Sequence, residues 1–243
     1  MFSAAKKHTI ERIRKAPIRT NPFPHLFIEE IFPPDFYAEM QRHRMPDEDF
    51  RSLVSTGRVN KAYSAERLCY MPDQEPTAAA SARFWQTLFA AYNDEDFLNV
   101  WLERFAPYLQ KRIDDGFGFA DNATNPRTEI FLMRDKRNYV LRPHTDVPSK
   151  AISVLFYLPP DARFEMLGTS LYKPKNTESV AFGVHLDRED FDLIATIPFR
   201  ANAALGFPNL PGSLHGVETL DGSEQVRDIM LYDVKFLPRV PAA

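Results

Sequence analysis

Histidine and aspartate residues in the second half of the chain have the spacing of metal ligands. His144 and Asp146 lie two positions apart, at the end of the predicted strand YVLRPHTD. Residues i and i+2 of a strand share a face, so an imidazole nitrogen and a carboxylate oxygen can reach one point. A second imidazole would complete a 2-His-1-carboxylate facial triad, which suits non-heme Fe(II). We expect His215, in the turn-then-strand context PGSLHGVE, to supply it.

A second His-x-Asp pair, His185 and Asp187, competes with the first. In a jelly roll, roughly four strands separate the first two ligands from the last, and these need about 40–50 residues. The segment from Asp146 to His215 is long enough, whereas the segment from Asp187 to His215 is too short. We therefore place the metal site at His144, Asp146 and His215. His185 is then a loop residue, either solvated or in contact with substrate near the mouth of the site.

An arginine follows the last candidate ligand on the next predicted strand. Arg227 comes after a turn marked by Asp221-Gly222 and alternates with Ile229 and Leu231, which predicts that the three share an inward face. A buried guanidinium needs a carboxylate partner. That partner is either a structural Asp or Glu, or the carboxylate of an organic-acid cosubstrate held by two parallel hydrogen bonds.

These residues lie in a β-rich half of the chain that begins near Gly116. Short runs rich in Phe, Tyr, Ile and Val are bounded there by Pro, Asn, Asp and Gly, a pattern typical of a β-sandwich or jelly roll. The runs are RTEIFLMRD, NYVLRPH, AISVLFYLP, SVAFGVHL, ATIPFRANAALGF and QVRDIMLYDVKFL. The chain has 20 prolines and 9 glycines, which also favours short strands separated by turns.

The first half is predicted to be mostly helical. Apolar residues at helical spacing, together with helix start signals, predict helices over 1–17, 33–44, 77–93 and 97–113, and a strand over 22–32. Pro107 is expected to bend or divide the last helix. No linker separates the halves, so we predict one domain, 1–243, of the α+β, mainly β class. A mostly helical layer (1–115) braces a double-stranded β-helix, or jelly roll (116–243).

Composition excludes several other classes. The 243 residues are 44% hydrophobic and 26% charged with a net charge of -3, which fits a globular protein without the basic field that nucleic acid requires. No apolar run is long enough to span a bilayer, and the N-terminal segment lacks the apolar core of a signal peptide. The single cysteine, Cys69, is interpreted as a buried small residue and fits a reducing compartment. We therefore expect a cytoplasmic protein with no membrane partner.

The His-x-Asp pair, the distal histidine and the arginine beyond it resemble the Fe(II)/2-oxoglutarate-dependent oxygenases, most closely their prolyl-hydroxylase-like branch. YVLRPHTD is similar to the strand that carries the first two ligands in that family, and ISVLFYLPP is similar to the strand after it. The resemblance implies Fe(II), 2-oxoglutarate as cosubstrate and O2, with ascorbate as a candidate reductant. It also implies that Arg227 and Tyr157 bind the C5 carboxylate of 2-oxoglutarate.

By this resemblance the chain is a dioxygenase, an oxidoreductase that hydroxylates an unactivated C–H bond of a peptide or small metabolite and releases succinate and CO2. Arg142, Tyr172 and His185 are its candidate substrate contacts. The stretch 165–190 departs from the family pattern, and we expect part of it to form an irregular rim over the iron, with Tyr172 or His185 facing the pocket. Two alternatives are a cupin-like metal-dependent isomerase or hydrolase without 2-oxoglutarate, and a non-catalytic jelly-roll binding module.

Overall fold

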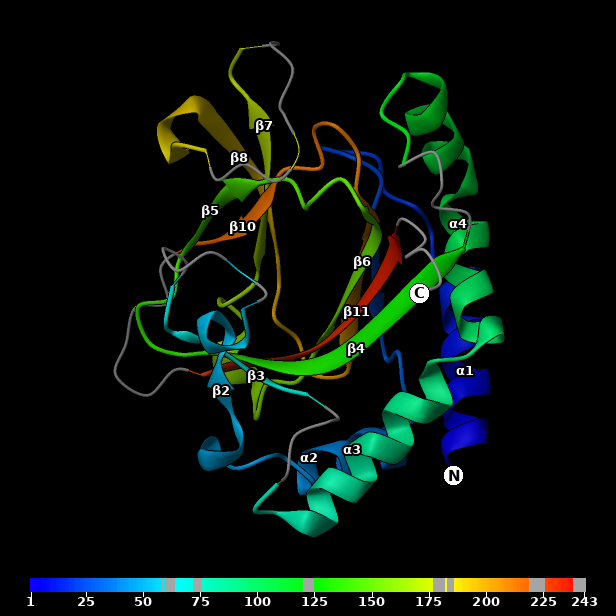
Figure 1. Cartoon of the computed structure of the whole chain (residues 1–243), viewed down its shortest axis with the longest axis vertical. Helices are drawn as coiled ribbons and strands as arrows, with labels where there is room; N and C mark the ends of the chain where they lie inside the picture. Colours follow the sequence, from blue (N-terminus) through cyan, green and yellow to red (C-terminus); the bar gives the residue numbers. More distant parts are fainter. Residues whose placement is uncertain are drawn as a thin grey trace, which may run out of the picture.

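Two antiparallel β-sheets and a layer of helices make up the computed structural model of the chain (Figure 1). The structure describes residues 1–57, 59, 64–71, 76–119, 125–176, 182, 186–218 and 226–237. Apolar side chains from both sheets pack into one cluster, which includes Leu155 and Leu205 from the larger sheet and Leu171 and Val217 from the smaller one. The two sheets therefore face each other, as in a jelly roll.

Within the described residues, the larger sheet has seven strands and the smaller sheet has four. In spatial order, the larger sheet consists of β1 (Leu26–Glu29), β9 (Ala203–Pro208), β6 (Lys150–Tyr157), β11 (Arg227–Phe236), β4 (Pro126–Asp135), β3 (Arg67–Tyr70) and β2 (Arg51–Ser52). The smaller sheet consists of β5 (Leu141–His144), β10 (His215–Val217), β7 (Thr169–Pro174) and β8 (Phe191–Ile197). The first half of the chain thus adds strands to both edges of the larger sheet as well as helices.

Four α-helices come from the first half of the chain: α1 (Phe2–Lys15), α2 (Pro34–Arg42), α3 (Ala79–Tyr92) and α4 (Glu95–Asp114). In Figure 1 they lie along the outer side of the larger sheet, away from the smaller one. A cluster of buried aromatic residues fills the layer between, including Trp101 of α4 and Phe156 of β6. No helix in the described ranges is long and apolar enough to cross a membrane.

Pro107 was expected to bend or divide this helix. Helix α4 runs through Pro107 without a break, so the proline does not divide it. Pro107 lies on the exposed side of α4, where the backbone carbonyl that loses its hydrogen bond can be hydrated. Buried Phe105 and Leu109 hold the helix to the core on either side of the proline. At its start, the Asp94 carboxylate accepts a hydrogen bond from the backbone N–H of Phe97 and caps the helix.

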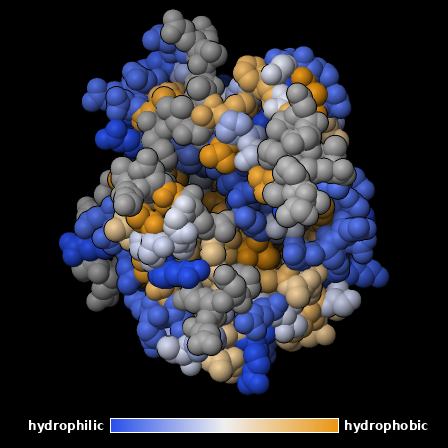
Figure 2. Space-filling view, in the orientation of Figure 1, coloured by the Kyte–Doolittle hydropathy of each residue, from blue (hydrophilic) through white to orange (hydrophobic). Residues whose placement is uncertain are grey.

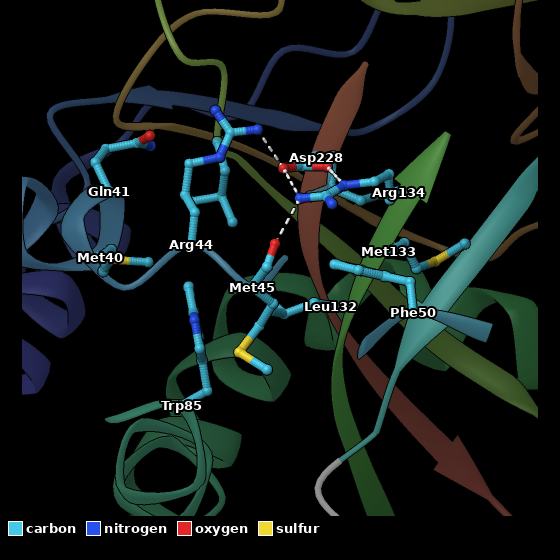
Figure 3. Close-up of a pocket in the computed structure, with 12 residues that line it drawn as sticks. Met40, Gln41, Arg44, Met45, Phe50, Trp85, Leu132, Met133, Arg134 and Asp228 are labelled. Carbon is cyan, nitrogen blue, oxygen red and sulfur yellow. Dashed lines mark hydrogen bonds and ion pairs between the residues drawn. The ribbon is translucent and has the colours of Figure 1, made fainter. Parts of the chain in front are cut away.

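Strands β4 and β11 carry ion pairs on both faces of the larger sheet. Arg134 is paired in register with Asp228, and Asp135 with Arg227. Arg134 donates from Nε and Nη2 to the Asp228 carboxylate, on the side where α2 ends and Arg44 makes a further contact (Figure 3). Because neighbouring residues of a strand face opposite ways, Asp135 and Arg227 point between the two sheets. The predicted double-stranded β-helix is confirmed, and its inner face carries buried charge.

Candidate metal and cosubstrate site

The pairing of β5 with β10 brings the predicted metal ligands together. His144 and His215 are register partners, and their ring centroids are 4.3 Å apart. Asp146 follows the end of β5, and its Oδ2 lies 4.0 Å from Nε2 of His215. The ligand atoms of the three residues all lie within 4.8 Å of one another, and the described residues contain no other such group of three. This spacing fits a single ion bound between them.

Backbone carbonyls fix the tautomer of both imidazoles. Nδ1 of His144 lies 3.0 Å from the carbonyl oxygen of Arg142, and Nδ1 of His215 lies 3.0 Å from that of Ser213. A carbonyl only accepts hydrogen bonds, so in the neutral form of each ring Nδ1 carries the proton and Nε2 keeps its lone pair. Burial lowers the pKa of His215 below its ordinary value. The imidazole is therefore neutral at pH 7, which is the form that binds a metal.

The carboxylate of Asp146 is held by a lysine and a serine. Lys150 Nζ lies 3.1 Å from Oδ1, and the hydroxyl of Ser153 donates to Oδ2 at 2.6 Å. Burial alone would raise the pKa of Asp146, but the charge of Lys150 and the hydrogen bond from Ser153 hold it well below its usual range. Lys150 also contacts Asp233 Oδ2 at 3.0 Å. The ligand is thus ionised, and a buried ammonium group lies beside it.

A cavity of about 940 Å³ lies between the sheets and includes the triad in its wall. The face shown in Figure 2 is mainly hydrophilic, with hydrophobic residues gathered toward its centre. The polar and charged residues that line the cavity include Arg67, Arg142, His144, Asp146, Lys150, Ser153, Thr169, His215, Arg227 and Asp233. The volume falls within the range of small-molecule sites.

Two arginines and one aspartate form a buried row across three strands of the larger sheet. Asp135 of β4 is in register with Arg67 of β3 on one side and with Arg227 of β11 on the other. Arg67 donates from Nε and Nη2 to Asp135 at 2.6 and 2.8 Å, and Arg227 donates from Nη1 at 2.8 Å. Two guanidinium groups of the described residues therefore share one carboxylate, and both arginines line the cavity.

Thr169 connects Arg227 with Tyr157. The Tyr157 hydroxyl and Nη2 of Arg227 both donate to Oγ1 of Thr169, each at 2.8 Å. A hydroxyl oxygen that accepts two hydrogen bonds still has its own proton to donate. Thr169 lines the cavity, whereas Tyr157 is fully buried behind it. The structure therefore brings Arg227 and Tyr157 together at a third residue that can donate to an anion.

The other predicted site residues differ in their placement. Arg142 lines the cavity, is exposed and forms an ion pair with Asp187 at 3.0 Å. Tyr172 is not among the described lining residues: it is 1% exposed, packs with Phe191 and Leu214, and donates to Glu218 at 2.7 Å. Its position in β7 explains this, because β7 is a strand of the smaller sheet that pairs with β10 and with β8, although its register with β8 shifts at Tyr172. His185 and residues 177–181 lie outside the described residues.

Arg67, Asp135 and Thr169 are the site residues that sequence reasoning missed. Arg67 lies in a segment, 46–75, without clear periodicity, so no pattern marks its strand. Asp135 ends a predicted strand, but its burial depends on pairing with β3 and β11. A count of charged residues at strand ends could have made Asp135 a candidate partner for Arg227.

No protein-family model matches the sequence, and no curated protein matches it. Solved structures are similar in fold. The non-heme alpha-ketoglutarate-dependent epimerase SnoN from nogalamycin biosynthesis has a TM-score of 0.51 at 12% identity, over 96% of this chain and 81% of SnoN. An oxidoreductase of the 2OG-Fe(II) oxygenase family from Burkholderia pseudomallei has a TM-score of 0.47 at 10% identity, over 96% and 90% of the two chains. A Pseudomonas putida prolyl-4-hydroxylase has a TM-score of 0.45 at 12% identity, over 98% and 100%.

At such low identity, the likeness to SnoN concerns the fold. It agrees with the two facing sheets. The chain therefore has the double-stranded β-helix fold that occurs in 2-oxoglutarate- and iron-dependent enzymes.

Proposed function

We propose that the chain is an Fe(II)- and 2-oxoglutarate-dependent dioxygenase that hydroxylates an unactivated C–H bond of a peptide or small metabolite. The observation that carries the proposal is the combination of two sites in one cavity. His144, Asp146 and His215 form a facial triad, and Arg227 and Thr169 are buried hydrogen-bond donors in the wall of the same cavity. A dicarboxylic 2-oxo acid needs both, because one end chelates the metal and the other end is an anion.

In this proposal His144, Asp146 and His215 hold Fe(II) through the two Nε2 atoms and one carboxylate oxygen. The bound iron, together with 2-oxoglutarate and O2, supplies the oxidation of the substrate and releases succinate and CO2. The remaining roles belong to the chain itself. Arg227 and the Thr169 hydroxyl donate hydrogen bonds to the distal carboxylate and so orient the 2-oxo acid. Ser153 and Lys150 hold Asp146 ionised and in place.

The substrate would occupy the rest of the cavity, whose apolar lining includes Leu155, Leu231 and Val147. A cavity of this size has room for a small molecule or a peptide side chain beside the 2-oxo acid. Arg227 and Thr169 in the cavity wall disfavour a metal isomerase or hydrolase without 2-oxoglutarate, because such an enzyme does not bind the distal carboxylate of a cosubstrate. The intact triad speaks against a binding module that keeps only the fold.

The test is a turnover screen with Fe(II), 2-oxoglutarate and O2 over pools of peptides, amino acids and metabolites. We expect one pool to raise succinate release and to yield a product one oxygen atom heavier than its substrate. The Asp146→Ala variant, which removes one ligand, should lose both signals. A protein that binds Fe(II) but neither binds nor consumes 2-oxoglutarate would contradict the proposal and favour other metal chemistry.

A further inference from the structure

The turn that carries the metal ligand Asp146 is held by two buried side chains from other parts of the chain. This turn, residues 146–150, begins at Asp146 and ends at Lys150, whose ammonium group contacts the Asp146 carboxylate. We propose that Arg112 of α4, acting with Asn209, is a positioning residue for Asp146 and thereby sets the affinity of the metal site. The inference rests on the metal site of the proposed function.

Arg112 donates hydrogen bonds to four backbone carbonyls. Nη1 donates to the carbonyl of Lys150 at 3.0 Å and to that of Asn209 at 2.8 Å. Nη2 donates to the carbonyl of Pro148 at 2.5 Å, and Nε to that of Phe117 at 2.7 Å. Two of the four acceptors belong to the ligand turn itself. The planar guanidinium of arginine can reach several acceptors in fixed directions, which a lysine ammonium cannot do.

Asn209 supplies the second set of bonds to the same turn. Its Nδ2 contacts the carbonyl oxygens of Asp146, Val147 and Lys150 at 3.2, 2.9 and 3.0 Å. Its own carbonyl accepts from Arg112, so the two residues act as a unit. Together they bind the backbone carbonyls of residues 146, 147, 148 and 150. The Asp146 backbone is therefore fixed from two directions before any ion binds.

The surroundings of Arg112 are unusual for a charged group. The side chain is 1% exposed, and its guanidinium lies 4.2 Å from the ring centroid of Phe119 and 4.6 Å from that of Phe182. All the hydrogen-bond acceptors found for it in the described residues are carbonyls, not carboxylates. Burying a charge in this way is costly. A well-packed apolar residue at this position would cost the folded state less free energy than a buried charge. What the arginine adds is the set of hydrogen bonds that fixes the turn of Asp146.

The test measures metal affinity and folding stability separately. Wild type, Arg112→Met and Asn209→Ala are titrated with Mn(II) alone by calorimetry, at a temperature where circular dichroism shows each to be folded. Loss of a residue that orients a metal ligand typically weakens metal binding by about 10–100-fold. We expect Mn(II) affinity to fall at least tenfold in each single variant. In the double variant the fold-loss of affinity should be smaller than the product of the two single fold-losses, because both residues hold the same turn. The absorption spectrum of bound Co(II) should change in shape as well, because the ligand is displaced.

Arg134→Met is the matched control. Arg134 is also a buried arginine, with bonds to Asp228 and to the carbonyl of Met45 on the opposite face of the sheet (Figure 3). It should lose stability but keep the wild-type Mn(II) affinity and Co(II) spectrum. If Arg112→Met does not fold, Arg112→Lys, which keeps the charge but not the fork of donors, replaces it. Wild-type Mn(II) affinity in the folded Arg112 and Asn209 variants would overturn the inference. Failure of the wild type itself to bind Mn(II) would overturn the metal site and the proposed function with it.

Discussion

At the scale of single residues, the site has two charged centres with different purposes. One is the triad of His144, Asp146 and His215, in which Asp146 is ionised and His215 is neutral at pH 7. The other is the row of Arg67, Asp135 and Arg227, in which two guanidinium groups share one carboxylate. The proposed cosubstrate contacts both centres. Because the centres are separate groups of residues, a substitution in the arginine row should leave metal binding by the triad intact.

Replacement of Arg227 tests the second centre. Arg227→Leu removes the donor to Thr169 and a charge-assisted bond worth roughly 1.5–3 kcal/mol. The Mn(II)-loaded variant should bind 2-oxoglutarate about 10–100-fold more weakly in calorimetry, with Mn(II) affinity nearly unchanged. Arg163→Leu, at an exposed arginine paired with Asp161, should match wild type. Unchanged 2-oxoglutarate affinity in Arg227→Leu would remove this residue from the cosubstrate site.

Replacement of Lys150 tests the first centre. Lys150→Met leaves the carboxylates of Asp146 and Asp233 without their shared ammonium group. Loss of one partner from a buried ion pair costs about 3–5 kcal/mol, so urea unfolding should show a much less stable metal-free protein. Mn(II) restores positive charge beside Asp146 and should raise the stability of the variant more than that of wild type. An equal metal-induced gain in both proteins would show that Lys150 does not balance the charge of Asp146.

The sequence was informative about the triad and much less so about its surroundings. Two residues at i and i+2 on a strand are a local pattern, and the order of the jelly roll narrows the choice of the third ligand to His215. Arg67 and Asp135, in contrast, meet only because β3 adds to the edge of the larger sheet beside β4. Thr169 acquires its role from two hydrogen bonds that no sequence pattern encodes.

At the scale of elements, close packing of α4 against β9 fixes the helical layer on the sheet. A Cβ atom added to Gly206 of β9 would lie 2.5 Å from the ring of Trp101 in α4. Trp101 is fully buried and cannot move aside easily. Gly206→Ala should therefore lower the free energy of unfolding by about 1–3 kcal/mol. Gly118→Ala, at a glycine with no atom near its Cβ position, is the control, and equal stability of the two variants would refute this account of the packing.

Buried histidines in the strands should make the metal-free protein sensitive to acid. Burial lowers the pKa of His25, at the start of β1, and that of His215 below 6.5. The unfolded chain therefore binds more protons than the folded one below pH 6.5, so stability is complete above this pH and falls as pH decreases. The loss is up to about 1.4 kcal/mol per pH unit for each histidine. Urea unfolding at pH 7.5 and 5.5 checks this, and His25→Gln should reduce the difference; a larger stability at pH 5.5 would contradict it.

The element pattern explains which parts of the fold were predictable. Helical spacing identified α1, α3 and α4 to within a few residues, because these helices each bury one continuous face. Pro34 marked the start of α2. β2 and β3 were missed because they lie in a segment, 46–75, without clear periodicity. β7 was missed because its stretch was expected to form a rim over the iron. Pro107 does not divide α4, because it lies on the exposed side of the helix.

At the scale of the whole molecule, the two sheets and the helical layer together hold the proposed metal ligands in place. The larger sheet provides the floor of the cavity and its arginine row, and the smaller sheet provides both histidines. The helical layer covers the outer face of the larger sheet and, through Arg112, reaches the turn of Asp146. The central claim is that this assembly binds Fe(II) and 2-oxoglutarate as one unit.

The most direct measurement of that claim is an anaerobic titration of the Fe(II)-loaded protein with 2-oxoglutarate, followed by visible absorption. Chelation of Fe(II) by a 2-oxo acid produces a metal-to-ligand charge-transfer band. We predict a saturable band in wild type, a band that requires a much higher 2-oxoglutarate concentration in Arg227→Leu, and no band in Asp146→Ala. Absence of the band in wild type that has demonstrably bound Fe(II) would contradict the account.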